Sequence, residues 1–141
     1  MSDPFGLQRF VDAQDAGGTY QQALAELRAG AKRGHWMWFV FPQLAGLGRS
    51  AMAQRYAISG AAEARAYLAH PVLGPRLLDC ARALAGLDTA DPVAVLGGID
   101  AQKLQSSMTL FAAVAPDEPL FPAVLDKYFA GRRDPATLER L

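Results

Sequence analysis

The sequence has few residues that can bind a metal or form a disulfide. Its 141 residues include one cysteine, Cys80, and two histidines, His35 and His70, which stand far apart in the chain. One cysteine excludes an internal disulfide and fits a reducing compartment, so we expect a cytoplasmic protein. Without a Cys/His cluster we expect no zinc or iron site, and no sequence motif points to a cofactor.

Net charge and long apolar runs are also lacking. Lys and Arg together number 14, as do Asp and Glu, so the formal net charge is zero. A neutral chain has no general attraction for nucleic acid, which argues against nucleic acid as a partner. No apolar run approaches the ~18 residues that a membrane-spanning helix needs. The first residues also lack the basic and apolar segments of a signal peptide.

What the sequence does have is a large apolar fraction, 51%, interrupted by signals for helix starts. Proline follows Asp or His at Asp3-Pro4, His70-Pro71, Asp91-Pro92 and Asp134-Pro135. Proline suits the first position of a helix, and an Asp before it can accept a free backbone N–H. We therefore predict an all-α fold, a single domain spanning 1–141 with about seven to nine short helices.

Apolar residues recur at helical spacing between these signals. We predict helices at about 4–14, 20–29, 51–58, 60–69, 71–87, 92–96, 100–114, 119–130 and 135–141. Gly74-Pro75 can delay the start of the helix at 71–87 by a turn. Asp100 is expected to cap the helix that it begins, and Gly30 and Gly131 to end the helices before them. Cys80 falls on the apolar stripe of its helix, so we expect it to be buried.

The stretch 32–43 stands apart from these helices. Residues 36–41 are all large and apolar, so the segment must be buried on every side, as a central strand or as an enclosed helical turn. Polar residues flank it, and these cannot enter a core without partners. The stretch is either a core segment with solvated ends or the aromatic wall of a ligand pocket with a polar rim.

A second polar set lies on the helix at 100–114. Asp100, Lys103 and Ser107 share one face, and Ser106 lies beside them. Lys103 with Ser107 can hold a phosphate or a carboxylate, or Lys103 can activate a hydroxyl nucleophile. The alternative is a face of small residues that packs against another helix. Glu26 precedes the basic residues at 32 and 33 and is expected to pair with one of them.

The order of these motifs resembles the DUF1810 family, small proteins of unknown function found mainly in bacteria. The matching elements are DPF at 3–5, KRGHWMWFVFPQ at 32–43, GLG at 46–48, YAI at 56–58, HPVLG at 70–74 and SSMTLF at 106–111. The resemblance implies an all-helical fold and brings no established activity. A relation to proteins that act on nucleotides or ADP-ribosyl compounds rests on fold-level analogy alone.

Two functions follow as hypotheses, and the sequence leaves open whether the protein is an enzyme. The first is a pocket for an anionic small molecule such as a nucleotide or an ADP-ribosyl compound, which it binds or hydrolyses. Its expected residues are Lys32, Arg33, His35, Trp36, Trp38, Phe41, Gln43, Asp100, Lys103, Ser106 and Ser107. If the pocket is catalytic, the candidates are His35, Lys103 and Ser107. The alternative is a non-enzymatic module that binds a protein partner, with structural polar motifs.

Overall fold

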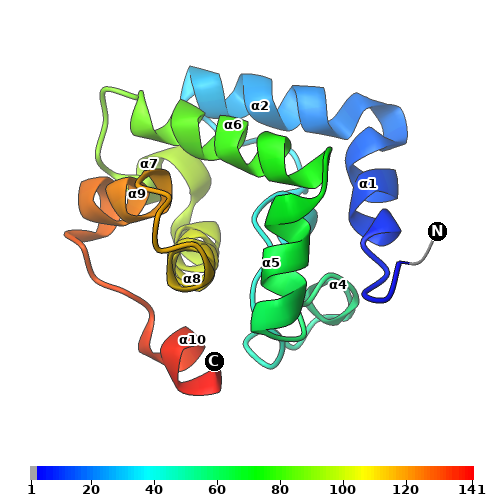
Figure 1. Cartoon of the computed structure of the whole chain (residues 1–141). Coiled ribbons are helices and arrows are strands. Elements are labelled where there is room, and N and C mark those ends of the chain that lie inside the picture. Colours follow the sequence, from blue (N-terminus) through cyan, green and yellow to red (C-terminus); the bar gives the residue numbers. More distant parts are fainter. Residues whose placement is uncertain (1–2) are drawn as a thin grey trace.

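The computed structural model describes residues 3–141, so Met1 and Ser2 of the N-terminus considered above lie outside it (Figure 1). Its α-helices are α1 (Gln8–Asp15), α2 (Thr19–Ala29), α3 (Met37–Val40), α4 (Ala51–Arg55), α5 (Ala61–Ala69), α6 (Leu73–Ala85), α7 (Pro92–Leu96), α8 (Gly98–Val114), α9 (Leu120–Phe129) and α10 (Pro135–Arg140). A 3-10 turn, η1 (Ala16–Gly18), joins α1 to α2. Residues 3–141 contain no strand, and the predicted all-α fold is confirmed. With the single turn α3 set aside, nine α-helices remain, the upper end of the predicted number.

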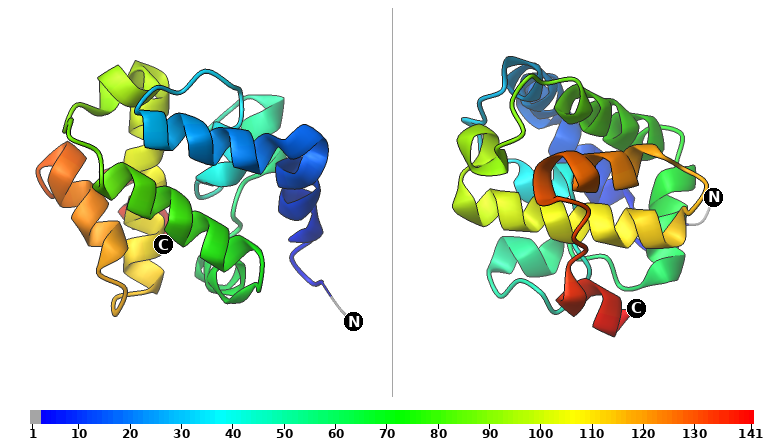
Figure 2. Two further views of the ribbon diagram at one scale, coloured as in Figure 1. Left: turned by 90° about the horizontal axis from the view of Figure 1, so that it is seen from above. Right: turned by 90° about the vertical axis from the view of Figure 1, so that its left-hand side faces the viewer.

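Helix α8 is the centre of the packing. It contacts α5, α7, α9 and α10, while α6 contacts α2, α5 and α9. Figure 1 views α8 nearly along its axis, and the right-hand view in Figure 2 shows α9 lying along it. Almost every residue from 104 to 112 is buried, so α8 has an apolar or uncharged surface on all sides in its second half.

Side chains set where several helices begin. The Asp3 carboxylate accepts the N–H groups of Leu7 (2.8 Å) and Gln8 (2.9 Å), which holds a turn before α1 and delays its start to Gln8. His70 Nδ1 accepts the N–H groups of Val72 and Leu73, so α6 begins two residues after Pro71. The predicted starts at Pro4 and Pro71 are therefore too early, because a turn intervenes between the capping residue and the helix.

Asp100 does not cap its helix, which corrects the expectation from the sequence. Helix α8 begins at Gly98 after Gly97, whose φ of 88° suits glycine, and Asp100 lies inside the first turn. Its carboxylate is consequently free to bind side chains from elsewhere in the chain.

The aromatic stretch forms the enclosed helical turn, α3, rather than a strand. Trp36, Met37, Val40 and Phe41 are almost completely buried. After it the chain makes one isolated parallel bridge, in which Ala45 N–H donates to Ile58 O (2.8 Å) and Ile58 N–H donates to Gln43 O (2.9 Å). This bridge fixes the backbone of Gln43. Among residues 3–141, no helix is both long enough and apolar enough to cross a bilayer.

Candidate functional site

Glu26 holds the loop 30–36 that leads into the aromatic stretch. Helix α2 ends at Gly30 in the left-handed conformation, and the chain then folds back over Glu26. One carboxylate oxygen of Glu26, Oε1, accepts the N–H groups of Arg33 (2.7 Å) and Gly34 (2.9 Å) and the indole N–H of Trp36 (3.0 Å). Glu26 therefore binds backbone and indole groups, and the expected ion pair with Lys32 or Arg33 does not form.

The pKa of Glu26 reflects this arrangement. Partial burial raises the pKa, but hydrogen bonds from Gly34, Arg33, Trp36 and Gln22 outweigh it and lower the pKa to about 2. Four donors stabilise the charged form more than desolvation penalises it. Glu26 thus remains ionised at neutral pH and acts as the fixed anchor of the loop.

Lys32 joins this loop to the central helix. Its N–H donates to Val95 O of α7 (2.8 Å), and its ammonium donates to Gly34 O and binds Asp100 Oδ2 at 2.8 Å. The ammonium also lies 5.0 Å from the centre of the Trp36 ring, and the side chain is only 9% exposed. The stretch 32–43 and the helix carrying Lys103 therefore meet, as the pocket hypothesis requires.

Lys103 is held more loosely than Lys32. Its Nζ lies 3.6 Å from Asp100 Oδ1 and 5.0 Å from the centre of the Trp38 ring, with the side chain 22% exposed. A lysine ammonium has three donors, and this one has no close hydrogen-bond acceptor among residues 3–141. Lys32 and Lys103 share Asp100, so this aspartate can neutralise only one of the two positive charges.

A hollow of about 270 Å³ opens beside Lys103. It lies between α8, the start of α10 and the loop that follows the aromatic stretch. Its polar lining residues are Gln43, Gln102, Lys103, Ser106 and Asp134. Its other lining residues, which are small or aliphatic, are Leu47, Gly48, Ile99 and Ala136. We call this the Lys103 hollow.

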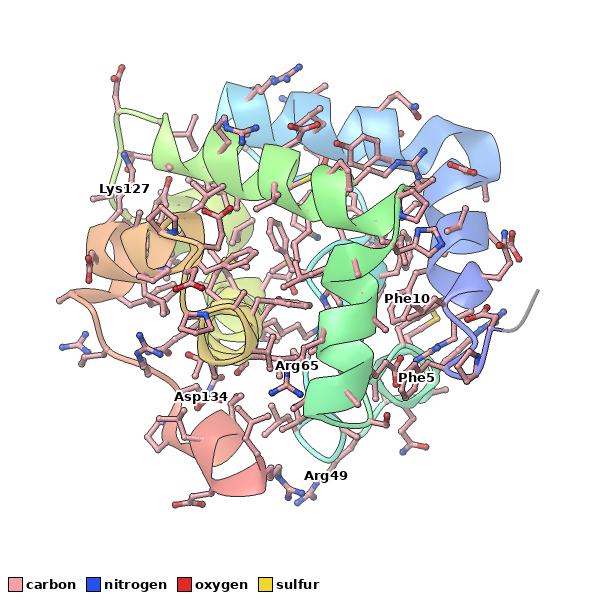
Figure 3. The ribbon with its side chains drawn as sticks, viewed as in Figure 1. Phe5, Phe10, Arg49, Arg65, Lys127 and Asp134 are labelled. Atoms are coloured by element: carbon pink, nitrogen blue, oxygen red, sulfur yellow. The ribbon has the colours of Figure 1, made fainter. Side chains whose placement is uncertain are left out.

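Asp134 lies at the junction of α8 and α10, where Figure 3 labels it. Its Oδ2 accepts the hydroxyl hydrogens of Ser106 (2.8 Å) and Thr137 (2.6 Å), and its N–H donates to Thr109 Oγ1 (2.9 Å). Ser106 and Thr109, whose hydroxyls are unfavourable in a helix interior, are therefore explained by the contact with Asp134, whereas Ser107 is not. Sequence reasoning missed Asp134 as a site residue because it reads as an ordinary helix cap 28 residues away from Ser106.

The structure separates the residues that the sequence analysis placed in one pocket. Trp36 and Phe41 are each 1% exposed and Ser107 is fully buried, so these three lie in the core and not in the hollow. Burial also removes Ser107 as a candidate nucleophile, and its hydroxyl has no hydrogen-bond partner among residues 3–141. Arg33 and His35 are exposed in the loop 30–36 and do not line the hollow. Gln43, Lys103 and Ser106 do line it. Asp100 and Trp38 lie next to Lys103, and Lys32 binds Asp100.

Comparison with known protein families shows which family the chain belongs to. The model of the family described as "Protein of unknown function (DUF1810)" matches residues 4–141, nearly the whole sequence. The chain belongs to the DUF1810 family. The resemblance seen in the motifs is thereby confirmed.

One solved structure is closely similar to this DUF1810 chain. It is titled "Crystal structure of the conserved hypothetical protein Rv1873 from Mycobacterium tuberculosis at 1.38 A", and its sequence is 50% identical. The similarity covers 99% of this chain and 98% of that one, with a TM-score of 0.95. The comparison with curated proteins finds no match. The fold is thus shared with an experimental structure.

A second polar cluster of the DUF1810 chain is structural. The guanidinium of Arg9 donates to the backbone oxygens of four residues in 5–57 and to the buried Glu63 (2.9 Å), whose other oxygen accepts Ser59 N–H. The donors of this arginine are committed within the protein. The cluster fastens the segment before α1 to α4 and α5, and it presents no free group to a ligand.

Proposed function

We propose that this DUF1810 protein binds a small anionic molecule in the Lys103 hollow. The observation that carries the proposal is the state of Lys103, a largely buried lysine with spare donors that lines an open hollow. A solvated lysine would place its ammonium in water, whereas this one is held against Trp38 and beside Asp100. Lysine in such a position acts as a point charge for a phosphate or a carboxylate. We also propose a cytoplasmic location, because a single free and buried cysteine, Cys80, fits a reducing compartment.

The surroundings of the hollow add positive charge. Arg49 follows directly after the lining residue Gly48, and the Arg140 guanidinium lies against Gly46, where an added Cβ would be 2.4 Å from its Nη1. Neither arginine forms an ion pair within residues 3–141. Figure 3 shows Arg49 at the end of the molecule where α10 lies. Unpaired positive charges around a concave site raise the local concentration of anions.

The hollow supports binding rather than hydrolysis. Ser107 is enclosed in the core, and His35 is not among the residues that line the hollow. Of the three candidate catalytic residues, only Lys103 lines the hollow. We therefore propose a binding site and no catalytic step.

A thermal-shift experiment tests the proposal. The ligands are inorganic phosphate, ribose 5-phosphate, AMP and ADP-ribose, each with the wild-type protein and Lys103→Met. A ligand at tenfold excess over its Kd stabilises the native state by about 1.4 kcal/mol, so the melting temperature rises. Lys103→Met is expected to abolish the rise while remaining folded.

Lys127→Met is the matched control for this experiment. Lys127 also lies over an aromatic ring, that of Tyr128 at 5.6 Å, and donates to Leu87 O, but it belongs to α9 and does not line the hollow. Its variant should keep the full ligand-induced shift. If no ligand stabilises the wild type, or if Lys103→Met responds as the wild type does, the proposal is wrong.

A protein-binding function is the second candidate, and one observation favours it. Ile99, in the first turn of α8 at the rim of the hollow, is 75% exposed, and Val93 of the neighbouring α7 is 55% exposed. Exposed large aliphatic side chains on two helices in contact, here α7 and α8, favour a protein interface. Substituting Ile99→Ser should then weaken a partner complex in pull-down experiments without changing the melting temperature. Unchanged capture would remove the support for this candidate.

A further inference from the structure

The Lys103 hollow contains an acceptor as well as a cation. Asp134 lines the hollow, and only its Oδ2 is used within residues 3–141, by the hydroxyls of Ser106 and Thr137. Its Oδ1 accepts no hydrogen bond from the described residues. A carboxylate oxygen that is free in a binding hollow repels a bare anion and attracts O–H donors.

The orientation of Asp134 is not that of a helix cap. Asp91 stands in the same Asp-Pro context, and its Oδ1 accepts the N–H groups of Val93 (3.0 Å) and Ala94 (3.3 Å). Asp134 precedes α10 in the same way but makes no capping bond to its backbone. Its carboxylate accepts one hydroxyl from Ser106 of α8 and one from Thr137 of α10, which fixes its orientation between the two helices. This is how a site residue is oriented by its neighbours.

The remaining lining narrows the class of ligand. Among residues 3–141, no aromatic side chain lines the hollow, so a nucleobase finds no stacking surface there. The volume of about 270 Å³ lies just below the range of roughly 300–1,000 Å³ typical of sites for drug-sized ligands. The amides of Gln43 and Gln102 can each donate and accept. These features suit a compact polyhydroxylated molecule better than a dinucleotide.

From the proposed function and the free oxygen of Asp134, we infer that the Lys103 hollow selects a phosphorylated sugar of about pentose size. Lys103 holds the phosphate, and Asp134 Oδ1 accepts hydroxyl groups of the sugar. The inference rests on the proposed function and adds the substrate class to it. It also replaces the nucleotide expected from the sequence, because Trp36 and Phe41 lie in the core and Trp38 is covered by Lys103.

The test is isothermal titration of two ligands, ribose 5-phosphate and methyl phosphate. Both carry the same monoester dianion, and only the first has sugar hydroxyls. The wild type should bind ribose 5-phosphate at least tenfold more tightly. In Asp134→Asn the amide oxygen can still accept from Ser106 and Thr137, while an NH₂ group replaces the free oxygen. This variant should bring the two affinities within about threefold, chiefly by weakening ribose 5-phosphate.

The possible outcomes distinguish a failure of the sugar-phosphate inference from a failure of the proposed anion binding. Equal binding of both ligands by the wild type, or an undiminished preference in Asp134→Asn, overturns the inference and leaves anion binding at Lys103 in place. Binding of neither ligand overturns the inference together with the proposed function. The wild-type ratio of affinities needs no variant, so the inference stays falsifiable even if Asp134→Asn does not fold.

Discussion

The anchoring of the loop 30–36 by Glu26 makes a prediction whose size can be worked out. Glu26→Gln keeps an acceptor oxygen for the three N–H donors but removes the charge, and Glu26→Ala removes the acceptor. Hydrogen bonds to charged groups contribute roughly 1.5–3 kcal/mol and neutral ones roughly 0.5–1.5 kcal/mol, so Glu26→Gln, which weakens three such bonds at a partly exposed carboxylate, should cost about 2 kcal/mol of stability. Glu26→Ala leaves the buried indole N–H of Trp36 unpaired and should cost about 3 kcal/mol.

The lowered pKa of Glu26 adds a pH dependence with a definite sign. Its ordinary value of 4.5 applies to the unfolded chain and about 2 to the native state. The native state therefore gains stability that is complete above about pH 4.5 and is lost as the pH falls toward 2. The full difference corresponds to at most about 3.4 kcal/mol at 1.36 kcal/mol per pH unit. Because Glu26 is partly open to solvent, we expect about half of that.

Urea unfolding followed by tryptophan fluorescence measures both effects. The chain has two tryptophans, Trp36 and Trp38, and both adjoin the site. At pH 7 the order of stability should be wild type, Glu26→Gln, Glu26→Ala. The difference between the wild type and Glu26→Gln should shrink between pH 4.5 and 2, since protonated Glu26 then resembles Gln. Equal stabilities at pH 7, or a difference that does not change with pH, would refute the anchoring role.

Substitutions at four other positions test the packing by their effect on the midpoint of urea unfolding. Ser107→Ala removes a buried hydroxyl without a partner and should stabilise the native state by about 1 kcal/mol. Ser106→Ala removes a donor to Asp134 and should destabilise it by about 1 kcal/mol. A change of the same sign for both variants would contradict this account. His70→Ala should lower the stability by about 1 kcal/mol because it removes the cap of α6, and His70→Asp should restore most of that stability. If His70→Asp is as unstable as His70→Ala, capping is not the cause. Gly74→Ala should destabilise by more than about 2 kcal/mol, although alanine normally favours a helix, because its Cβ would lie 2.1 Å from a backbone oxygen of α5. A stabilised Gly74→Ala would show that the two helices are free to separate.

The helices were predictable because their signals are local. Apolar spacing places α2, α5, α7 and α9 within a residue or so of their observed bounds, and Gly30 ends α2 as expected. These signals depend on neighbouring residues alone. The starts of α1 and α6 were placed too early because Asp3 and His70 reach over a turn to the N–H groups that they cap, a detail that the Asp-Pro and His-Pro pairs do not encode.

The site was predictable only in part, because it depends on contacts between distant segments. The polar face of Lys103 and the polar ends of the stretch 32–43 were singled out, and Lys32 and Asp100 do bring them together. Trp36 was assigned to a pocket wall because a run of aromatic residues does not reveal which ring is enclosed. Asp134 was missed because the Ser106 contact that orients it spans 28 residues. Side-chain direction in such cases is decided by tertiary packing.

The most direct test of ligand binding in the Lys103 hollow is a titration of ¹⁵N-labelled protein with ribose 5-phosphate, followed by NMR. The side-chain amides of Gln43 and Gln102 line the hollow and report on its occupation. The amide of Gln14 is buried and bonded to Phe39 O (2.8 Å), so it serves as an internal control. We predict saturable shifts of the Gln43 and Gln102 amides with none at Gln14. Absence of shifts at both lining amides, or shifts confined to Arg33 and His35 in the loop 30–36, would contradict the account.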